Sequence, residues 1–141
     1  MPKTPPIINL VVLKASDIHR AASFYQLLGI SMERHQHGSG PWHYCTQLND
    51  LVFEIYPNQS DEDAPASTRL GFQVDDLDST LQHLQEHGVK VLRHKATSPW
   101  GFRAVVEDFA GHRVELIEKE RLSTELVEEN QRVACALPLG S

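Results

Sequence analysis

The chain has 141 residues, of which 40% are hydrophobic and 23% charged, and its formal net charge is -6 at pH 7. That length and composition predict one globular domain and exclude a disordered or fibrous chain. An acidic chain without a clustered basic stripe is a poor binder of nucleic acid, because phosphate affinity depends on Lys and Arg. No segment has the length and hydropathy of a signal peptide or a membrane span, so we expect a cytoplasmic protein.

Two segments of the chain repeat one plan. Residues 15–30 read ASDIHRAASFYQLLGI and residues 74–89 read VDDLDSTLQHLQEHGV, at a constant offset of 59. Each copy places an Asp where a helix N-cap belongs, then about three turns of helix, then a Gly suited to the left-handed C-terminal position. We therefore predict two equivalent helices, capped by Asp17 and Asp76.

One apolar strand precedes each predicted helix, and three strand-like runs follow it. In chain order the predicted strands are 7–13, 30–36, 42–48 and 51–57 in the first copy, and 69–74, 89–94, 101–107 and 112–118 in the second. Each copy is therefore a βαβββ module. We predict one domain over residues 1–118, with module one at 7–57, a polar linker at 58–67 and module two at 68–118. In the tail, residues 119–141, apolar side chains spaced 4, 7 and 4 residues apart predict a helix that packs on the body or on a partner subunit.

The segments LKASDIHRAASFYQLLGI, RLGFQVDDLD and SPWGFRAVVEDFAGHRVELIE, together with the internal repeat, resemble the vicinal oxygen chelate (VOC) superfamily. This superfamily includes glyoxalase I, bleomycin-resistance proteins and extradiol dioxygenases, and the resemblance covers residues 7–118. It implies an α+β fold in which the two modules form a cup-shaped mixed sheet around a small ligand or a divalent metal. It also implies a homodimer. The reaction stays open, because this fold supports many activities.

In the metal-dependent members of that family, four ligands come from the first and the last strand of each module. The resemblance puts Leu10, Glu54, Arg69 and Glu115 at these four positions. Leucine offers no lone pair and arginine no acceptor, and two carboxylates alone hold a divalent ion weakly. We therefore predict no metal and no other cofactor. Arg69 would instead supply the positive charge and pair with Glu54, Glu115 or both, because a guanidinium matches carboxylates.

A histidine-rich segment, HQHGSGPWHYC at residues 35–45, joins two predicted strands. Its GSGP predicts the turn between them and not a phosphate cradle, which needs a following helix. The Asn-Asp pair at 49–50 suits a tight two-residue hairpin, whose register pairs Cys45 with Glu54. The pattern does not show which face of the sheet the first two histidines of the segment occupy.

The hairpin register also pairs His43 with Tyr56, on the same face as Glu54. The opposite face is more apolar and should pack under the helix, so the face of His43 is predicted to line the cup. His43 is then a hydrogen-bond donor or a base for a ligand, or a histidine satisfied inside the sheet. A further alternative is a rebuilt site for Zn, Fe or Ni from His43, Glu54 and Glu115, with His37 added.

The loop SPWGFR places Trp100 just before a strand, where the indole can stack on a flat ligand or anchor the loop. Arg103 reaches either the pocket or the surface, because the loop DFAG leaves the register of the last hairpin open. Asp108 and His112 are predicted to serve only that turn. Cys45 is predicted to be an unreactive, buried thiol.

The leading hypothesis is a metal-independent protein that binds a small organic molecule in a cup. Its predicted ligand-binding residues are Leu10, His43, Glu54, Tyr56, Arg69, Trp100, Arg103 and Glu115. A few polar groups among apolar ones are typical of small-ligand pockets. The alternative is a family enzyme (a lyase, isomerase or dioxygenase) that uses the rebuilt metal site or metal-free acid–base chemistry with Glu54, Glu115 or His43. A third hypothesis is a fold kept only as an assembly or regulatory module. The ligand, and the pairing of the modules within or between chains, stay open.

Overall fold

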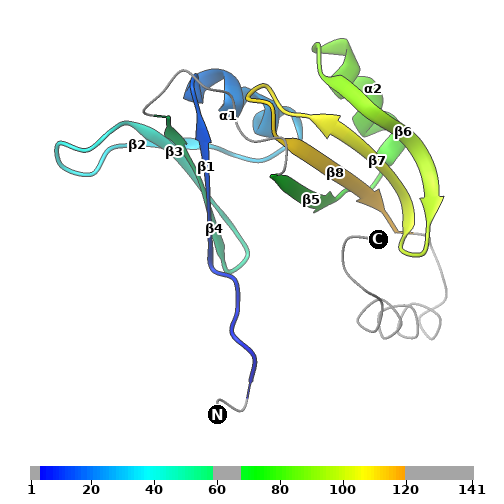
Figure 1. Cartoon of the computed structure of the whole chain (residues 1–141), viewed down its shortest axis with the longest axis horizontal. Helices are drawn as coiled ribbons and strands as arrows, with labels where there is room; N and C mark the ends of the chain where they lie inside the picture. The colour runs from blue at the N-terminus through cyan, green and yellow to red at the C-terminus, as the bar shows by residue number, and fades with distance from the viewer. Residues whose placement is uncertain (1–3, 59–67, 120–141) are drawn as a thin grey trace. The chain divides into compact units, whose positions relative to one another are not determined.

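Two βαβββ modules follow one another along the chain (Figure 1). The computed structural model describes residues 4–58 and 68–119. Module one contains β1 (Leu10–Ala15), α1 (Ile18–Leu27), β2 (Glu33–His35), β3 (His43–Leu48) and β4 (Leu51–Pro57). Module two contains β5 (Arg69–Gln73), α2 (Leu77–Glu86), β6 (Lys90–Ser98), β7 (Gly101–Glu107) and β8 (Arg113–Glu118). The predicted α+β class and element order are confirmed, whereas the predicted helix of the tail lies outside the described residues.

Each module forms its own four-stranded sheet. The strand orders are β1-β4-β3-β2 and β5-β8-β7-β6, and in both sheets the first strand pairs in parallel with the last. The repeat seen in the sequence therefore extends to strand pairing. The chain divides into two compact units, Met1–Thr68 with Glu107–His112 as unit 1, and Arg69–Val106 with Arg113–Ser141 as unit 2. The turn between β7 and β8 thus groups with module one, although it lies within module two in the sequence.

Both helices begin and end as the repeat predicts. The Asp17 carboxylate accepts hydrogen bonds from two backbone N–H groups of the first turn of α1, each at 3.1 Å, and Asp76 accepts one at 3.0 Å in α2. Gly29 and Gly88 follow the helices with φ angles of 94° and 85°, a left-handed conformation that strains a residue with a Cβ. Among the described residues, no helix is long and apolar enough to cross a membrane.

Each sheet packs one face against the helix of its own module. In module one, Phe53 of β4 is buried, and its ring centroid lies 4.9 Å from that of Tyr25 in α1. In module two, Leu84 of α2 and Leu116 of β8 are fully buried where the two elements meet. Burying each such side chain stabilises the fold by about 1.5–3 kcal/mol, so these apolar faces set the strand register. The opposite faces hold the predicted site residues.

The boundaries of β1, β2 and β6 differ most from the prediction, and β2 is confined to Glu33–His35 instead of residues 30–36. β1 starts at Leu10 rather than at residue 7, and Ile7 and Ile8 are exposed. The cause is pairing, because the parallel ladder with β4 begins only at Leu10, opposite Val52. β6 continues to Ser98 instead of ending at residue 94, since the tight turn into β7 begins only there.

Candidate ligand-binding site

The open face of module one carries residues that were predicted to line the cup. In the ladder between β1 and β4, Val12 lies opposite Glu54. Side chains two residues apart on a strand share a face, so Leu10, Val12 and Glu54 lie together. Leu10 and Val12 are 52% and 40% exposed, because they point away from the face that packs on α1. This face therefore offers apolar surface beside one carboxylate.

The predicted hairpin register of module one is confirmed. Cys45 pairs with Glu54, and Asn49 has a φ angle of 56°, as a tight two-residue turn requires. Continued by one more pair, this register brings His43 opposite Tyr56. Their rings stack with centroids 4.1 Å apart and planes 9° apart.

His43 is buried beneath its neighbours, with an exposed fraction of 1%. Its Nδ1 lies 3.2 Å from the Pro41 carbonyl, and its Nε2 lies 3.3 Å from the Tyr56 hydroxyl and 3.4 Å from Glu54 Oε2. Because a carbonyl only accepts, Nδ1 donates to the Pro41 carbonyl, and Nε2 faces both the Tyr56 hydroxyl and the Glu54 carboxylate. Of the alternatives for His43, the geometry favours a histidine whose two ring nitrogens already have partners inside the sheet. In this role His43 holds Tyr56 and Glu54 in position.

The structure places the two histidines whose face the sequence left open. His35 pairs with His43 across β2 and β3, so the two side chains share a face. The ring centroid of His43 lies 6.3 Å from that of His35 and 5.1 Å from that of His37. His35 Nε2 also contacts Glu33 at 3.2 Å. The Gly40 N–H donates to the His37 carbonyl at 3.0 Å, which confirms the predicted turn.

Negative charges surround the Cys45 thiol. Burial, and then the carboxylates of Glu54 and Glu33, raise the pKa of Cys45. Burial, Glu54 and Cys45 also raise the pKa of Tyr56. Both groups therefore stay protonated near neutral pH, and a protonated thiol is a weak nucleophile, in line with the predicted unreactive cysteine. The prediction that this thiol is buried is wrong, because Cys45 is only half-buried.

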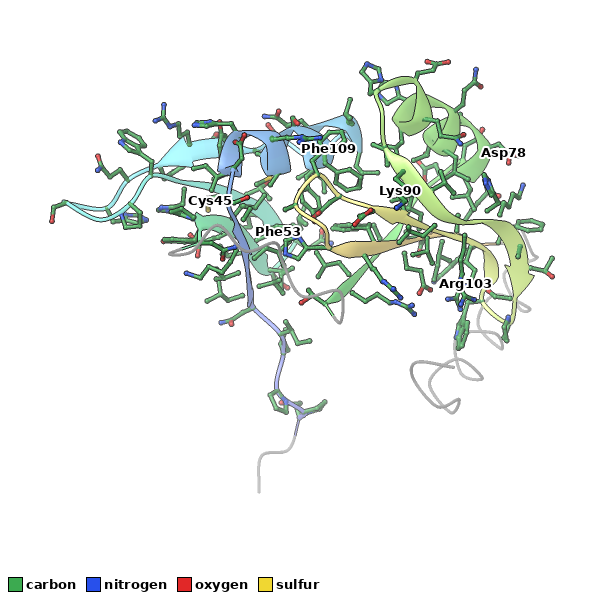
Figure 2. The ribbon with its side chains drawn as sticks, turned by 45° about the horizontal axis from the view of Figure 1, so that its top comes forward. Cys45, Phe53, Asp78, Lys90, Arg103 and Phe109 are labelled. Carbon is green, nitrogen blue, oxygen red and sulfur yellow. The ribbon has the colours of Figure 1, made fainter. Side chains whose placement is uncertain are left out.

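An ion-pair cluster lies on the open face of module two. Arg69 Nη1 of β5 lies 3.8 Å from Glu115 Oε2 of β8, and Arg103 Nη2 of β7 lies 3.4 Å from the same oxygen. The contact that the sequence predicted between Arg69 and Glu115 is present, and Arg103, whose direction was left open, joins it. Figure 2 shows Arg103 toward the end of the sheet where β6 turns into β7. The side chain of Arg69 is 41% exposed and that of Glu115 is 16% exposed, so an incoming molecule can reach the cluster.

A hollow of about 600 Å³ opens beside this cluster, within unit 2. The lining residues that matter for a ligand are Arg69, Arg93, Ser98, Pro99, Trp100 and Arg103. Ser98 Oγ accepts a hydrogen bond from the Trp100 backbone N–H at 3.3 Å and donates one to the Gly101 carbonyl at 2.8 Å. These bonds hold the turn that carries the indole. The structure thus brings Arg69, Trp100 and Arg103 to one hollow.

The four positions that the family resemblance assigns to a metal do not suit one in this chain. Leu10 has no donor atom, and Arg69 presents a guanidinium, rather than a lone pair, to Glu115. Glu54 lies against His43 instead of an open cavity. Within residues 4–58 and 68–119, no three His, Cys, Asp or Glu side chains are arranged to hold a metal ion. The donor set at these positions therefore does not fit a divalent cation.

Sequence reasoning missed Arg93, which also lines the hollow. Its immediate neighbours in the sequence carry no signal for a binding residue. β6 pairs with β7 and forms the edge of the sheet. The predicted strand ended at residue 94, so nothing in the sequence indicated that β6 would line a hollow together with the turn that carries Trp100.

The turn between β7 and β8 does more than connect two strands, contrary to the prediction for Asp108 and His112. Both are buried, and the Tyr25 hydroxyl of α1 donates to Asp108 Oδ2 at 2.6 Å. His112 Nδ1 donates to the same oxygen at 2.7 Å, and Oδ1 accepts two backbone N–H groups of the turn, each at 2.9 Å. Burial alone would raise the pKa of Asp108, but the hydrogen bonds from His112 and Tyr25 outweigh burial and lower it. Phe109 of the same turn lies against α1 (Figure 2).

Comparison with known proteins agrees with this architecture. A family model described as Glyoxalase/Bleomycin resistance protein/Dioxygenase superfamily matches residues 7–116. No curated protein sequence matches the chain significantly. Among solved structures, TnmS3, an antibiotic binding protein from Streptomyces sp. CB03234, is 24% identical with a TM-score of 0.68, and the match covers 84% of this chain and 100% of TnmS3.

Two further structures of similar fold are described as enzymes. A glyoxalase-related enzyme from Fulvimarina pelagi is 21% identical with a TM-score of 0.65, covering 80% of this chain and 88% of that one. Lactoylglutathione lyase from Agrobacterium tumefaciens is 22% identical with a TM-score of 0.60, covering 82% of this chain and 96% of that one. Identities of this size establish the shared fold alone.

Proposed function

The chain belongs to the glyoxalase/bleomycin resistance protein/dioxygenase superfamily, and we propose that it binds a small organic molecule without the help of a metal ion. One observation carries the proposal, namely the hollow of about 600 Å³ with Trp100 in its wall and Arg69 and Arg103 at its charged side. A few polar groups in a concave, partly apolar surface are typical of small-ligand sites. The fold shared with TnmS3, whose description is an antibiotic binding protein, supports a binding role.

Each module has its own proposed contact residues on its open face. In module two the contacts are Arg69, Trp100, Arg103 and Glu115, and in module one they are Leu10, Glu54 and Tyr56, with His43 as the residue that positions the last two. A homodimer is also part of the proposal, supported by the exposed apolar side chains of Ile7, Ile8 and Trp42. The cytoplasmic location stays a prediction.

Filling the space beside Glu115 is expected to abolish binding without unfolding the protein. Gly71 of β5 lies opposite Glu115 in the parallel ladder, and a Cβ built at Gly71 meets no atom within 4 Å. In Gly71→Leu the new side chain therefore extends over the face that holds Arg69 and Glu115. Saturable binding of the neutral fluorescent probe phenylnaphthylamine should be lost, whereas Gly71→Ala, which adds only the Cβ, should keep it. Equal probe binding by wild type and Gly71→Leu, at equal melting temperature, would contradict this location of the site.

Removal of divalent metals is expected to leave the protein unchanged. After treatment with EDTA and dialysis, the dissociation constant for phenylnaphthylamine should equal that of the untreated protein. Adding Mn, Fe, Ni or Zn should not raise the melting temperature, because two of the four family positions lack a donor atom. A clear rise with one equivalent of Zn would refute metal independence. The variant His43→Gln would then show whether the histidines of β2 and β3 are the ligands.

A further inference from the structure

The charge around the hollow of module two is strongly one-sided. Arg69, Arg93 and Arg103 line it, and none of its described lining residues is an Asp or Glu. The neighbouring carboxylate that contacts the guanidinium groups is Glu115. Two of the three guanidinium groups, those of Arg69 and Arg103, contact this carboxylate, in a chain whose formal net charge is -6. A positively charged hollow on an acidic protein favours the binding of a negatively charged ligand there.

Glu115 leaves N–H donors of Arg69 and Arg93 available. The distance from Arg69 Nη1 to Glu115 Oε2 is 3.8 Å, which is longer than the roughly 2.7–2.9 Å of a charge-assisted hydrogen bond. No described carboxylate forms an ion pair with Arg93. A guanidinium has five N–H donors, so Arg69 and Arg93 together retain donors for a second carboxylate. Their partial exposure makes these donors accessible from the hollow.

The wall of the hollow also favours a ligand with a flat, aromatic group. Trp100 and Pro99 form the turn at one end, and the hydrogen bonds of Ser98 hold this turn in place. An indole face gains contact area and favourable stacking from another aromatic ring. Ala104 and Val105 of β7 contribute small apolar side chains to the same lining.

We propose that the ligand of this hollow is an aromatic carboxylate, or an anion of the same planar shape. The carboxylate lies among Arg69, Arg93 and Arg103, and the ring packs against Trp100. This inference rests on the proposed function, since it names the chemical class that the same site binds. It adds a charge selectivity that a merely apolar pocket lacks.

A series of three probes of one shape and different charge tests the inference. Naphthoate is the anion, naphthamide is its neutral isostere and naphthylmethylammonium is the cation, and binding of each is measured by isothermal titration calorimetry. We expect naphthoate to bind roughly ten- to hundredfold tighter than naphthamide, the range that a hydrogen bond to a charged group contributes. The cation should bind more weakly than both.

Variants separate the arginines from the general charge of the protein. Arg69→Gln and Arg93→Gln should each weaken naphthoate binding roughly tenfold and leave naphthamide binding unchanged. The matched control is Lys95→Gln, which removes the same charge from β6. Lys95 Nζ pairs with Asp78 of α2 at 3.0 Å, and Lys95 does not line the hollow.

The outcomes of these measurements separate failure of the anion selectivity from failure of the proposed function. Equal binding of naphthoate and naphthamide, or tighter binding of the cation, overturns the anion selectivity and leaves the proposed function standing. Loss of naphthoate affinity in Lys95→Gln as large as in Arg93→Gln also overturns it. If none of the three probes nor phenylnaphthylamine binds, both the inference and the proposed function fail.

Discussion

Replacing Asp108 by alanine is expected to lower the free energy of unfolding by about 3–5 kcal/mol, the range for removing one member of a buried charged network. The Asp108 carboxylate accepts four hydrogen bonds, two on each oxygen. Its removal takes this acceptor away from the Tyr25 hydroxyl, the His112 ring N–H and two backbone N–H groups. Urea denaturation followed by tryptophan fluorescence measures the loss. A change below about 1 kcal/mol would contradict the network's role, because that is the size of a typical single hydrogen bond.

Two variants serve as controls for Asp108. Tyr25→Phe removes one donor and should cost only about 1–2 kcal/mol. Asp108→Asn tests the charge through pH. Because folding lowers the pKa of Asp108, its contribution to stability is present above the unfolded aspartate value of about 3.9 and is lost as the pH falls through the folded pKa. Wild type should therefore lose stability on acidification more steeply than Asp108→Asn does.

Gly101→Ala is expected to destabilise the protein by about 2–4 kcal/mol, from combined backbone strain and steric overlap. Gly101 has a φ angle of 124°, and a Cβ there would overlap the Glu118 carbonyl oxygen, a backbone atom that cannot rotate away. The start of β7 approaches the end of β8 this closely because position 101 has no side chain. Since Gly101 follows Trp100 directly, the substitution should also weaken binding in the hollow.

The matched control for this effect is Gly88→Ala. Gly88 also has a positive φ angle, 85°, but a Cβ there meets no atom within 4 Å. It should cost only the roughly 1–2 kcal/mol of left-handed backbone strain. Equal losses for the two variants in urea denaturation would show that the approach of the two strands is not tight, and the explanation for Gly101 would have to be withdrawn.

Much of the fold could be predicted because its signals are local. The Asp17 and Asp76 caps bond to N–H groups two or three residues away, and the turn at Asn49 fixes the pairing of Cys45 with Glu54. The alternation of apolar and polar side chains assigns strand faces in the same way. The pair of Arg69 and Glu115 followed as well, because the family resemblance assigns both residues to the positions of metal ligands.

The remainder of the site depends on contacts between distant segments. Tyr25 and Asp108 are 83 residues apart, and neither segment carries a sign of the other. His43 is buried because rings from β4 and from the preceding turn cover it, so its residue type alone did not distinguish a ligand contact from a satisfied core histidine.

Local sequence was thus sufficient for the family, the two modules, the helix caps, the hairpin register and the absence of a competent donor at two metal positions. Those features depend on residue type and on spacing within a few residues, where chain geometry leaves few alternatives. Long-range packing set the direction of Arg103, the place of Arg93 in the hollow and the buried acceptor at Asp108. These features depend on which strand edges and turns contact one another. Those contacts are determined by the combined burial of many side chains and not by any single segment.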